Sequence, residues 1–470
     1  MLSLNVAQNV LSSALDKGAT FADIFVEKNR SLLIKTLNGK VDKLETGTDF
    51  GIGVRLIFGT KVLYGITNSC EEHELLTLVN SIALFEKASV CNKPQQRGIP
   101  PIPTITRALN QHPSSGGLDS HKSEHSYDYK IERLLQMDQT VQKAHSRISQ
   151  AQAQLLQRLQ NVAIFNSEGL AISDERHYTR LTAFAVASDG KEQTVASKSL
   201  GALDGFDYTN HISLDALGEE AARKAVTILN AKLCPAEKMP VILGNGFGGV
   251  IFHEACGHLL ESAAVEKQAS IFTDKMDNII ASPIINAIDD GTIKNAWGSI
   301  NIDDEGMASS RLELIREGKL VNFMMDLVGH LKTGYARTGS ARRESYRFPP
   351  AARMRNTFIA PGSHSFEEMI TSIDYGLWAK NFGGGSVQPG TGDFNFVVEE
   401  GHLIRNGKIA EAVKGATLIG NGAEVLKNIS MVGCDLDSGV GICGSVSGSV
   451  PVTVGQPSLK VDAIVVGGRG

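Results

Sequence analysis

Residues 240–262 read PVILGNGFGGVIFHEACGHLLES and predict a short strand, a glycine turn and then a helix. The predicted helix contains His253-Glu254-Ala255-Cys256-Gly257-His258, an H-E-x-x-x-H pattern. A zinc hydrolase needs two imidazoles and a neighbouring carboxylate, because the ring nitrogens bind the metal and the carboxylate accepts a proton from the attacking water. The pattern therefore predicts a metal centre with His253 and His258 as ligands and Glu254 as the base.

The spacing of the two histidines requires a distorted helix. In the common H-E-x-x-H pattern the histidines are four positions apart and face one metal. Here they are five apart, which separates them by about 140° on a regular helix of ~3.6 residues per turn. A π-bulge or a helix break would bring them together, and Gly257 tolerates either distortion. Two unrelated histidines on a buried helix are the alternative.

The glycines before this helix also fit a dinucleotide-binding pattern. Gly244, Gly246 and Gly249 match G-x-G-x-x-G between a strand and a helix. However, no second strand ending in an acidic residue follows about 20 positions later, as that fingerprint requires; residues 266–278 are polar and irregular. A tight strand-to-helix turn beside the active site is the favoured interpretation.

A catalytic zinc usually has a third protein ligand, and the sequence leaves its identity open. Glu261 and Glu266 lie shortly after the second histidine, where related hydrolases place a ligand. Cys443 lies in the glycine-flanked stretch GICGSVSGSVPVTVGQP and is the other candidate. Cys256, inside the motif, and Cys434, in a polar loop, are interpreted as structural.

The composition describes an ordinary globular chain with many glycines. The 470 residues suggest two or three domains, and 42% hydrophobic with 21% charged residues allow a sizeable core. A net charge of −5 argues against a broad nucleic-acid surface, and six cysteines are too few for a disulfide scaffold. The N-terminus lacks the basic start of a signal peptide, and no apolar run approaches ~20 residues. We therefore expect a soluble, cytoplasmic protein without membrane contact.

The chain divides by pattern into three α+β units and a linker. Residues 1–95 form an N-terminal domain, with helices at 5–17 and 71–88 around an antiparallel meander. A linker rich in Pro, Ser, Gly and His spans 96–126. Residues 127–236 form a central domain, with helices near 127–147 and 214–233 around alternating strands. A glycine-rich, strand-rich C-terminal domain covers 237–470 and holds the metal motif.

Three further clusters of the C-terminal domain allow two interpretations each. Gly383-Gly384-Gly385 could leave a strand edge that pairs with a substrate backbone, or could be a mobile loop. The run Asp303-Asp304-Glu305 is interpreted as a solvated turn rather than a second metal site. Five residues could stabilise an oxyanion, or could form a solvated or interface basic strip; they are Arg342, Arg343, Tyr346, Arg353 and Arg355.

Together, these stretches resemble the TldD branch of the TldD/PmbA (TldD/TldE) zinc metallopeptidase family across nearly the whole chain. The resemblance rests on HEACGH after the glycine turn and on other C-terminal stretches, namely SARRESYRFPPAARMRNTFI (340–359), GGGSVQPGTGDFNF (383–396), GATLIGNGAEVLKNI (415–429) and VPVTVGQP (450–457).

The resemblance implies an α+β fold and a Zn²⁺-dependent peptidase that cleaves small or unfolded peptides. It implies that His253, His258 and Cys443 bind zinc and that Glu254 is the catalytic carboxylate. It also implies assembly with a PmbA/TldE-type homologous subunit, with a homodimer as the alternative. Ser445–Gly448 depart from the residues expected after the cysteine, which leaves subsite preferences open. A non-catalytic assembly subunit with a structural metal is the competing function, although the intact Glu254 argues against it.

Overall fold

The computed structural model describes residues 2–87, 100, 104–113, 126–388 and 390–468. The expected linker, 96–126, lies outside the described residues except at 100, 104–113 and 126. Within that stretch, the short strand β4 (Thr106–Arg107) pairs in parallel with a strand of the central unit.

The N-terminal unit contains the two predicted helices and three antiparallel strands. The first two strands are continuous over 17 and 19 residues. They turn at Asn38 and Gly39, whose φ angles of 48° and 77° suit these residues. The elements are α1 (Leu4–Asp16), β1 (Phe21–Leu37), β2 (Lys40–Phe58), β3 (Lys61–Thr67) and α2 (Glu72–Lys87).

The central unit places two helices on one face of three long strands. Ala151, Ala153 and Leu155 alternate with glutamines, so one face of the strand is apolar, and small alanines allow close helix packing. Serine side chains cap both helices at their N-termini. The elements are α3 (Tyr127–Lys143), β5 (Ile148–Asn166), β6 (Ala171–Ser188), β7 (Gln193–Ala202), η2 (Phe206–His211) and α4 (Leu214–Asn230).

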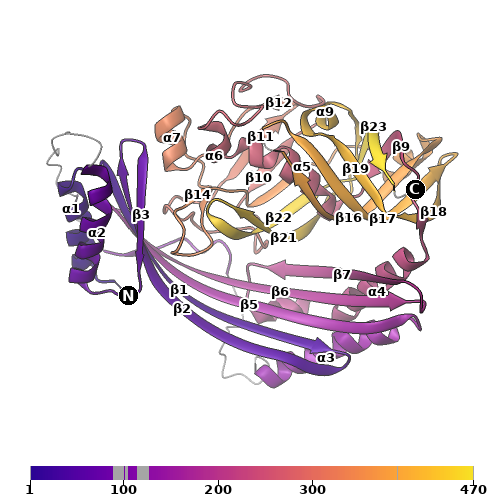
Figure 1. Ribbon diagram of the computed structural model, residues 1–470, viewed down its shortest axis with the longest axis horizontal. Coiled ribbons are helices and arrows are strands. Elements are labelled where there is room, and N and C mark those ends of the chain that lie inside the picture. The colour runs from indigo at the N-terminus through magenta and orange to yellow at the C-terminus, as the bar shows by residue number, and fades with distance from the viewer. Residues whose placement is uncertain (1, 88–99, 101–103, 114–125, 389, 469–470) are drawn as a thin grey trace.

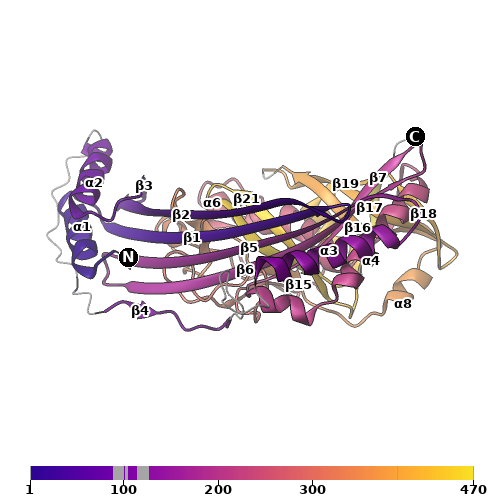
Figure 2. The ribbon, with the colours of Figure 1, turned by 90° about the horizontal axis from the view of Figure 1, so that it is seen from below.

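Strands of the N-terminal and central units form one sheet. Strand β1 pairs with β5 from Asp23↔Asn166 to Leu37↔Gln152, and the strand order is β3-β2-β1-β5-β6-β4, with β7 also on β6. The sheet is long and curved, with α1 and α2 at one end and α3 and α4 on its outer side (Figure 1). The C-terminal unit lies against the inner side, as the turned view also shows (Figure 2).

The C-terminal unit contains two large sheets around the largest apolar core of the molecule. The first sheet contains β10 (Ala287–Asp290), β11 (Arg311–Arg316), β12 (Lys319–Leu320), β15 (Asn356–Ile359), β21 (Asp437–Ser445) and β22 (Gly448–Gln456). Its order is β12-β11-β10-β15-β22-β21, so β21 is an edge strand. A two-strand ladder contains β13 (Ala341–Arg342) and β14 (Ala351–Ala352).

The second sheet contains β8 (Lys232–Leu233), β9 (Glu237–Leu243), β16 (Tyr375–Val387), β17 (Asp393–Arg405), β18 (Lys408–Lys414), β19 (Ala416–Asn421), β20 (Ile429–Val432) and β23 (Leu459–Gly467). The helices of this unit are short: η3 (Gly246–Gly249), α5 (Val250–Ala255), η4 (Gly257–Leu260), α6 (Ser262–Val265), α7 (Leu327–Thr333), α8 (Phe366–Thr371) and α9 (Gly422–Lys427). Among the described residues, no helix has the length and apolar character needed to cross a membrane.

The acidic run at residues 303–305 joins the sheet to the C-terminal unit, and its interpretation as a solvated turn is wrong. All three side chains are buried. Arg55 Nη1 of β2 donates to Glu305 Oε1 at 2.8 Å, and Arg176 Nη1 of β6 donates to Asp304 Oδ1 at 2.8 Å. Basic side chains from distant strands compensate the buried carboxylates, which sequence proximity alone does not reveal.

Candidate metal centre

The predicted strand, glycine turn and helix are present as β9, η3 and α5. The turn lies close to the neighbouring strand β22. A Cβ atom on Gly249 would lie 2.6 Å from the backbone of Gly455, so only glycine fits there. Gly246 has a φ of +69°, a conformation that glycine adopts without strain. These glycines form a tight strand-to-helix turn, in agreement with the interpretation that the sequence favours over a dinucleotide site.

A break in the helix brings the two histidines together. Helix α5 ends at Ala255, Cys256 adopts φ −133° and ψ −49°, and the 3₁₀ helix η4 begins at Gly257. Gly257 packs so tightly that an added Cβ would lie 2.2 Å from Met354 Sδ. The rings of His253 and His258 are 5.0 Å apart between centroids. Of the two expected distortions, the chain uses the helix break.

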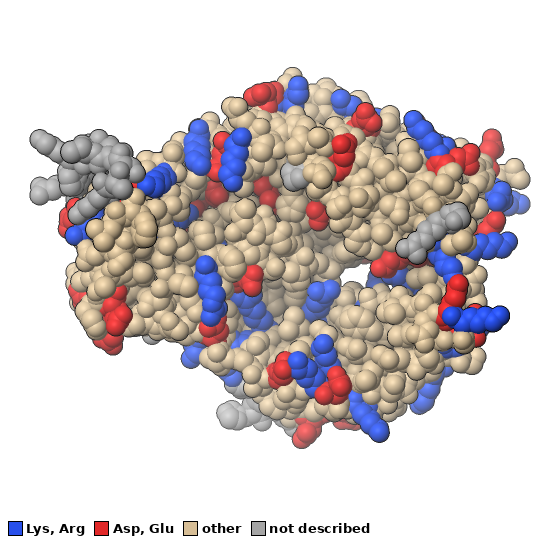
Figure 3. Space-filling view, viewed as in Figure 1, with Lys and Arg blue, Asp and Glu red and all other residues tan. Residues whose placement is uncertain are grey.

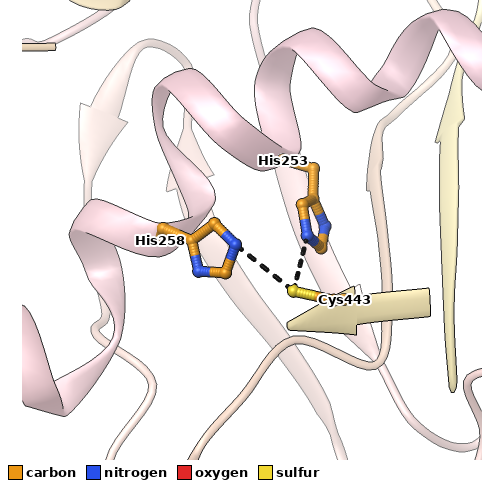
Figure 4. A group of neighbouring side chains, drawn as sticks. All are labelled: His253, His258 and Cys443. Atoms are coloured by element: carbon orange, nitrogen blue, oxygen red, sulfur yellow. Dashed lines mark hydrogen bonds between the residues drawn. The ribbon is translucent and has the colours of Figure 1, made fainter. Parts of the chain in front are cut away.

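Cys443, on the edge strand β21, completes a group of three donors (Figure 4). Its Sγ lies 3.2 Å from His253 Nε2 and 3.3 Å from His258 Nε2. One donor atom from each residue lies within 4.8 Å of the others. Zinc bonds of ~2.0–2.1 Å to nitrogen and ~2.3 Å to sulfur imply N···S separations of roughly 3.5 Å in a tetrahedral site. The donor set and its spacing therefore fit a tetrahedral metal with one open position.

The surroundings of His253 keep its imidazole in the neutral form. Its side chain is buried, and its Nδ1 has no hydrogen-bond partner among the described residues. Burial, together with the positive charges of His258 and Arg353, holds the pKa of His253 well below its usual range. The imidazole is therefore neutral, which is the form that coordinates metals.

Glu261 contacts His258 from the side opposite the cysteine. His258 Nδ1 donates to Glu261 Oε2 at 2.9 Å, and this bond leaves Nε2 facing Cys443. Burial alone would lower the pKa of His258, but the charges of Glu261 and Cys443 raise it well above its usual range. Glu261 thus orients a histidine of the donor group, whereas Glu266, the other acidic candidate, pairs with Lys332 at 3.1 Å.

Glu254 faces a cavity of about 780 Å³ between the C-terminal unit and the curved sheet. Figure 3 shows the molecule hollowed between these two parts, where acidic and basic side chains gather. Glu254 Oε2 lies 3.8 Å from His258 Nε2, and 29% of the Glu254 side chain is exposed. Burial raises the pKa of Glu254 above its usual value, which suits a carboxylate that must accept a proton.

The basic cluster at residues 342–355 is not a solvated strip, because Arg342, Arg343, Arg353 and Arg355 are all buried. Arg353 donates from Nη2 to the carbonyl of Cys443 at 2.6 Å and from Nη1 to Ser447 Oγ and the Gly448 carbonyl. These bonds hold the strand that carries the cysteine, so Arg353 fixes the position of Cys443 in the donor group.

The glycine stretch at 383–385 lines the cavity. Strand β16 pairs with β9 only from Leu377 to Ala379, whereas its pairing with β17 continues to Val387. Beyond Ala379, no described strand pairs with the other edge of β16. Pairing of this edge with a substrate backbone stays a prediction.

Sequence reasoning did not find the roles of Glu261 and Arg353 around the donor group. From sequence, Glu261 is considered only as a ligand, although a spacing of three residues from His258 allows the two side chains to meet. The link between Arg353 and Cys443 joins residues 90 positions apart and has no local sequence signal.

Comparison with known proteins identifies the family. Models of PmbA/TldA metallopeptidase domains match residues 22–85 as domain 1, 120–229 as the central domain and 236–468 as the C-terminal domain. The chain belongs to the PmbA/TldD metallopeptidase family. The resemblance drawn from the motifs is confirmed, as is the mixed α+β fold.

Similar family members are named as metalloproteases. The metalloprotease TldD homolog of Haemophilus influenzae is 34% identical over 477 aligned residues, 99% of this chain and 97% of the relative. The zinc metalloprotease TldD homolog of Saccharolobus solfataricus is 26% identical, over 97% of this chain and 99% of the relative. TldE from Thermococcus kodakarensis has the same fold, with a TM-score of 0.73 and 17% identity over 98% of this chain and 99% of TldE.

Proposed function

We propose that this member of the PmbA/TldD family is a zinc-dependent peptidase with His253, His258 and Cys443 as metal ligands. The convergence of these three donors supports this proposal, because Cys443 comes from a strand 185 positions after His258 and has no other charged or polar side-chain partner among the described residues. One relative is named a zinc metalloprotease, which agrees with zinc as the metal.

The chemistry follows from the placement of Glu254. Zinc, when bound, supplies Lewis acidity and lowers the pKa of a water in the open fourth position. Glu254 lines the cavity, and its raised pKa makes it the base that accepts the proton of the attacking water. The same carboxyl group then donates that proton to the nitrogen of the leaving amine. Glu261 keeps the Nε2 atom of His258 directed at the donor group.

The proposal also covers the kind of substrate and a partner subunit. We expect small or unfolded peptides, because Glu254 lies in a hollow between two parts of the chain that a folded protein surface would not enter. We also expect assembly with a PmbA/TldE-type subunit, since the fold is shared with TldE of another organism. A non-catalytic subunit with a structural metal is the alternative; a structural site would not need a base beside its ligands.

Zinc content and peptide cleavage, measured on the same preparations, test this function. Glu254→Gln should keep its zinc and lose about 10²- to 10⁴-fold in cleavage of an unfolded peptide mixture, because only the proton acceptor is removed. Cys443→Ala should lose zinc, whereas Cys434→Ala, at an exposed thiol, is the matched control and should behave as wild type. Full cleavage by Glu254→Gln would refute the assigned base. Tight zinc binding by Cys443→Ala would refute the ligand set.

A further inference from the structure

One arginine of the cavity has no acidic partner in the described part of the chain. Of the four basic residues that line the cavity, Lys224 pairs with Glu399, and Lys380 pairs with Glu400 at 3.0 Å. Lys198 is exposed to solvent. Arg180 of β6 is half-buried and forms no ion pair with any described residue. A desolvated guanidinium without a carboxylate is costly unless a ligand supplies one.

The contacts of Arg180 leave much of its donor capacity unused. Its Nη2 donates to Ser199 Oγ at 3.3 Å, and its buried Nε has no partner among the described residues. Burial, with no opposing acid, lowers the pKa of Arg180 below its usual range. The hydroxyls of Ser197 and Ser199 line the same wall. This wall combines a forked cation with hydroxyl donors, which is the arrangement that recognises carboxylates.

The alternation of β6 directs Arg180 toward the C-terminal unit. Leu181 and Ala183 face the helices α3 and α4, so Arg180 lies on the opposite face, toward the C-terminal unit. Tyr178, on the same face of β6, packs in a cluster with Trp297 against Val440 of β21. The indole of Trp297 also donates to the carbonyl of Gly441 at 2.8 Å.

Strand β21 carries both a residue of the cavity wall and the cysteine of the donor group. Val440 lines the cavity with Arg180 and precedes Cys443 by three residues on this strand. Glu254, the proposed base, lines the same cavity. A peptide whose reacting bond lies beside Glu254 therefore shares this cavity with Arg180.

From this geometry we propose that Arg180 determines specificity by binding a carboxylate of the substrate peptide, from its C-terminus or from an Asp or Glu side chain. The proposal rests on the proposed peptidase function. It deepens that function by assigning a substrate class, peptides that carry a carboxylate to one side of the cleaved bond.

Peptide binding to a catalytically inactive chain is the direct test. In the zinc-loaded full chain carrying Glu254→Gln, dissociation constants are measured for one pentapeptide in three forms: with a free C-terminus, with a C-terminal amide, and as an amide with Asp near that end. We expect at least one carboxylate form to bind about 10- to 100-fold more tightly than the plain amide, the range for hydrogen bonds to a charged group.

The variants decide whether Arg180 causes this preference. Adding Arg180→Gln should abolish it while leaving amide binding and the melting temperature unchanged, and Arg180→Lys should retain part of it. Arg316→Gln, at an exposed arginine of β11 that pairs with Glu313, is the matched control and should retain it fully. Tighter binding of the free C-terminus identifies the chain end as the source, and tighter binding of the Asp amide identifies the side chain.

Equal binding of all three peptides, or a preference that survives Arg180→Gln, would overturn the proposal. Cleavage by the unmodified, zinc-loaded chain separates this failure from failure of the proposed function. If the carboxylate subsite is wrong but the chain is a peptidase, the amide is still cleaved, at the same rate as the free acid. If no peptide is cleaved, alone or with a PmbA/TldE-type subunit, the peptidase function fails, whatever the binding data show.

Discussion

Replacing Glu261 tests whether the carboxylate behind His258 contributes to metal binding. The Glu261 side chain is 4% exposed and accepts the Nδ1–H of His258 at 2.9 Å. It also accepts the backbone N–H of Met354 at 3.3 Å and lies 3.8 Å from Arg353 Nε. This carboxylate therefore fixes the tautomer and the orientation of one proposed ligand.

The expected magnitude follows from what each substitution removes. Loss of a group that orients a metal ligand typically costs 10- to 100-fold in metal affinity, or about 1.4–2.8 kcal/mol. Glu261→Gln retains an oxygen acceptor for Nδ1–H but loses the charge, so we expect a loss of about tenfold. Glu261→Ala removes both and leaves the Met354 N–H unpaired, so we expect about 100-fold.

Competition with a chromophoric chelator measures zinc affinity directly, independently of peptide cleavage. Glu266→Gln is the matched control, because Glu266 lies five residues further on and pairs with Lys332 away from the donor group. Circular dichroism of each variant checks that the chain is folded. Wild-type zinc affinity in a folded Glu261→Ala variant would refute the assigned role of this carboxylate.

Three further predictions concern stability and the glycine turn. Glu305→Ala should lower the free energy of unfolding by about 3–5 kcal/mol in urea titrations, because it leaves Arg55 buried with one acidic partner fewer. Glu313→Ala, which breaks an exposed ion pair, should change the free energy of unfolding by less than about 1 kcal/mol. Equal effects of the two substitutions would contradict this prediction. Gly249→Ala should lower both the melting temperature and the zinc content, since its Cβ would lie 2.6 Å from neighbouring backbone; unchanged values would refute the close approach. Burial, together with the charge of Glu305, raises the pKa of Asp326 from 3.8 to about 6. The folded chain therefore binds the proton of the Asp326 carboxyl group more tightly than the unfolded chain does. The contribution of Asp326 to stability falls as the pH rises from about 4 to about 6. The melting temperature of Asp326→Asn should therefore rise relative to wild type between pH 4 and 6, and parallel curves would contradict the shift.

Local sequence was sufficient for the elements whose signals lie within a few residues. The residue pattern predicted the helices α1 and α4 close to their bounds. The H-E-x-x-x-H pattern located two of the three donors, and Gly257 indicated where the helix is distorted. These features depend on helix periodicity and on the conformations that glycine allows, both of which are properties of short segments.

The tertiary structure decided which distant segments meet. It joined β1 to β5 in one sheet and placed Cys443 beside two histidines almost 200 positions earlier in the chain. It also buried the acidic run at 303–305 against Arg55 and Arg176, although sequence reasoning treated that run as solvated. A charged residue carries no local sign of whether an opposite charge will reach it. The sequence alone thus determined the local elements and the histidine pair and offered several candidates for the third donor. Long-range packing determined which candidate joins the histidines, the contacts that support it and the surroundings of Arg180 in the cavity.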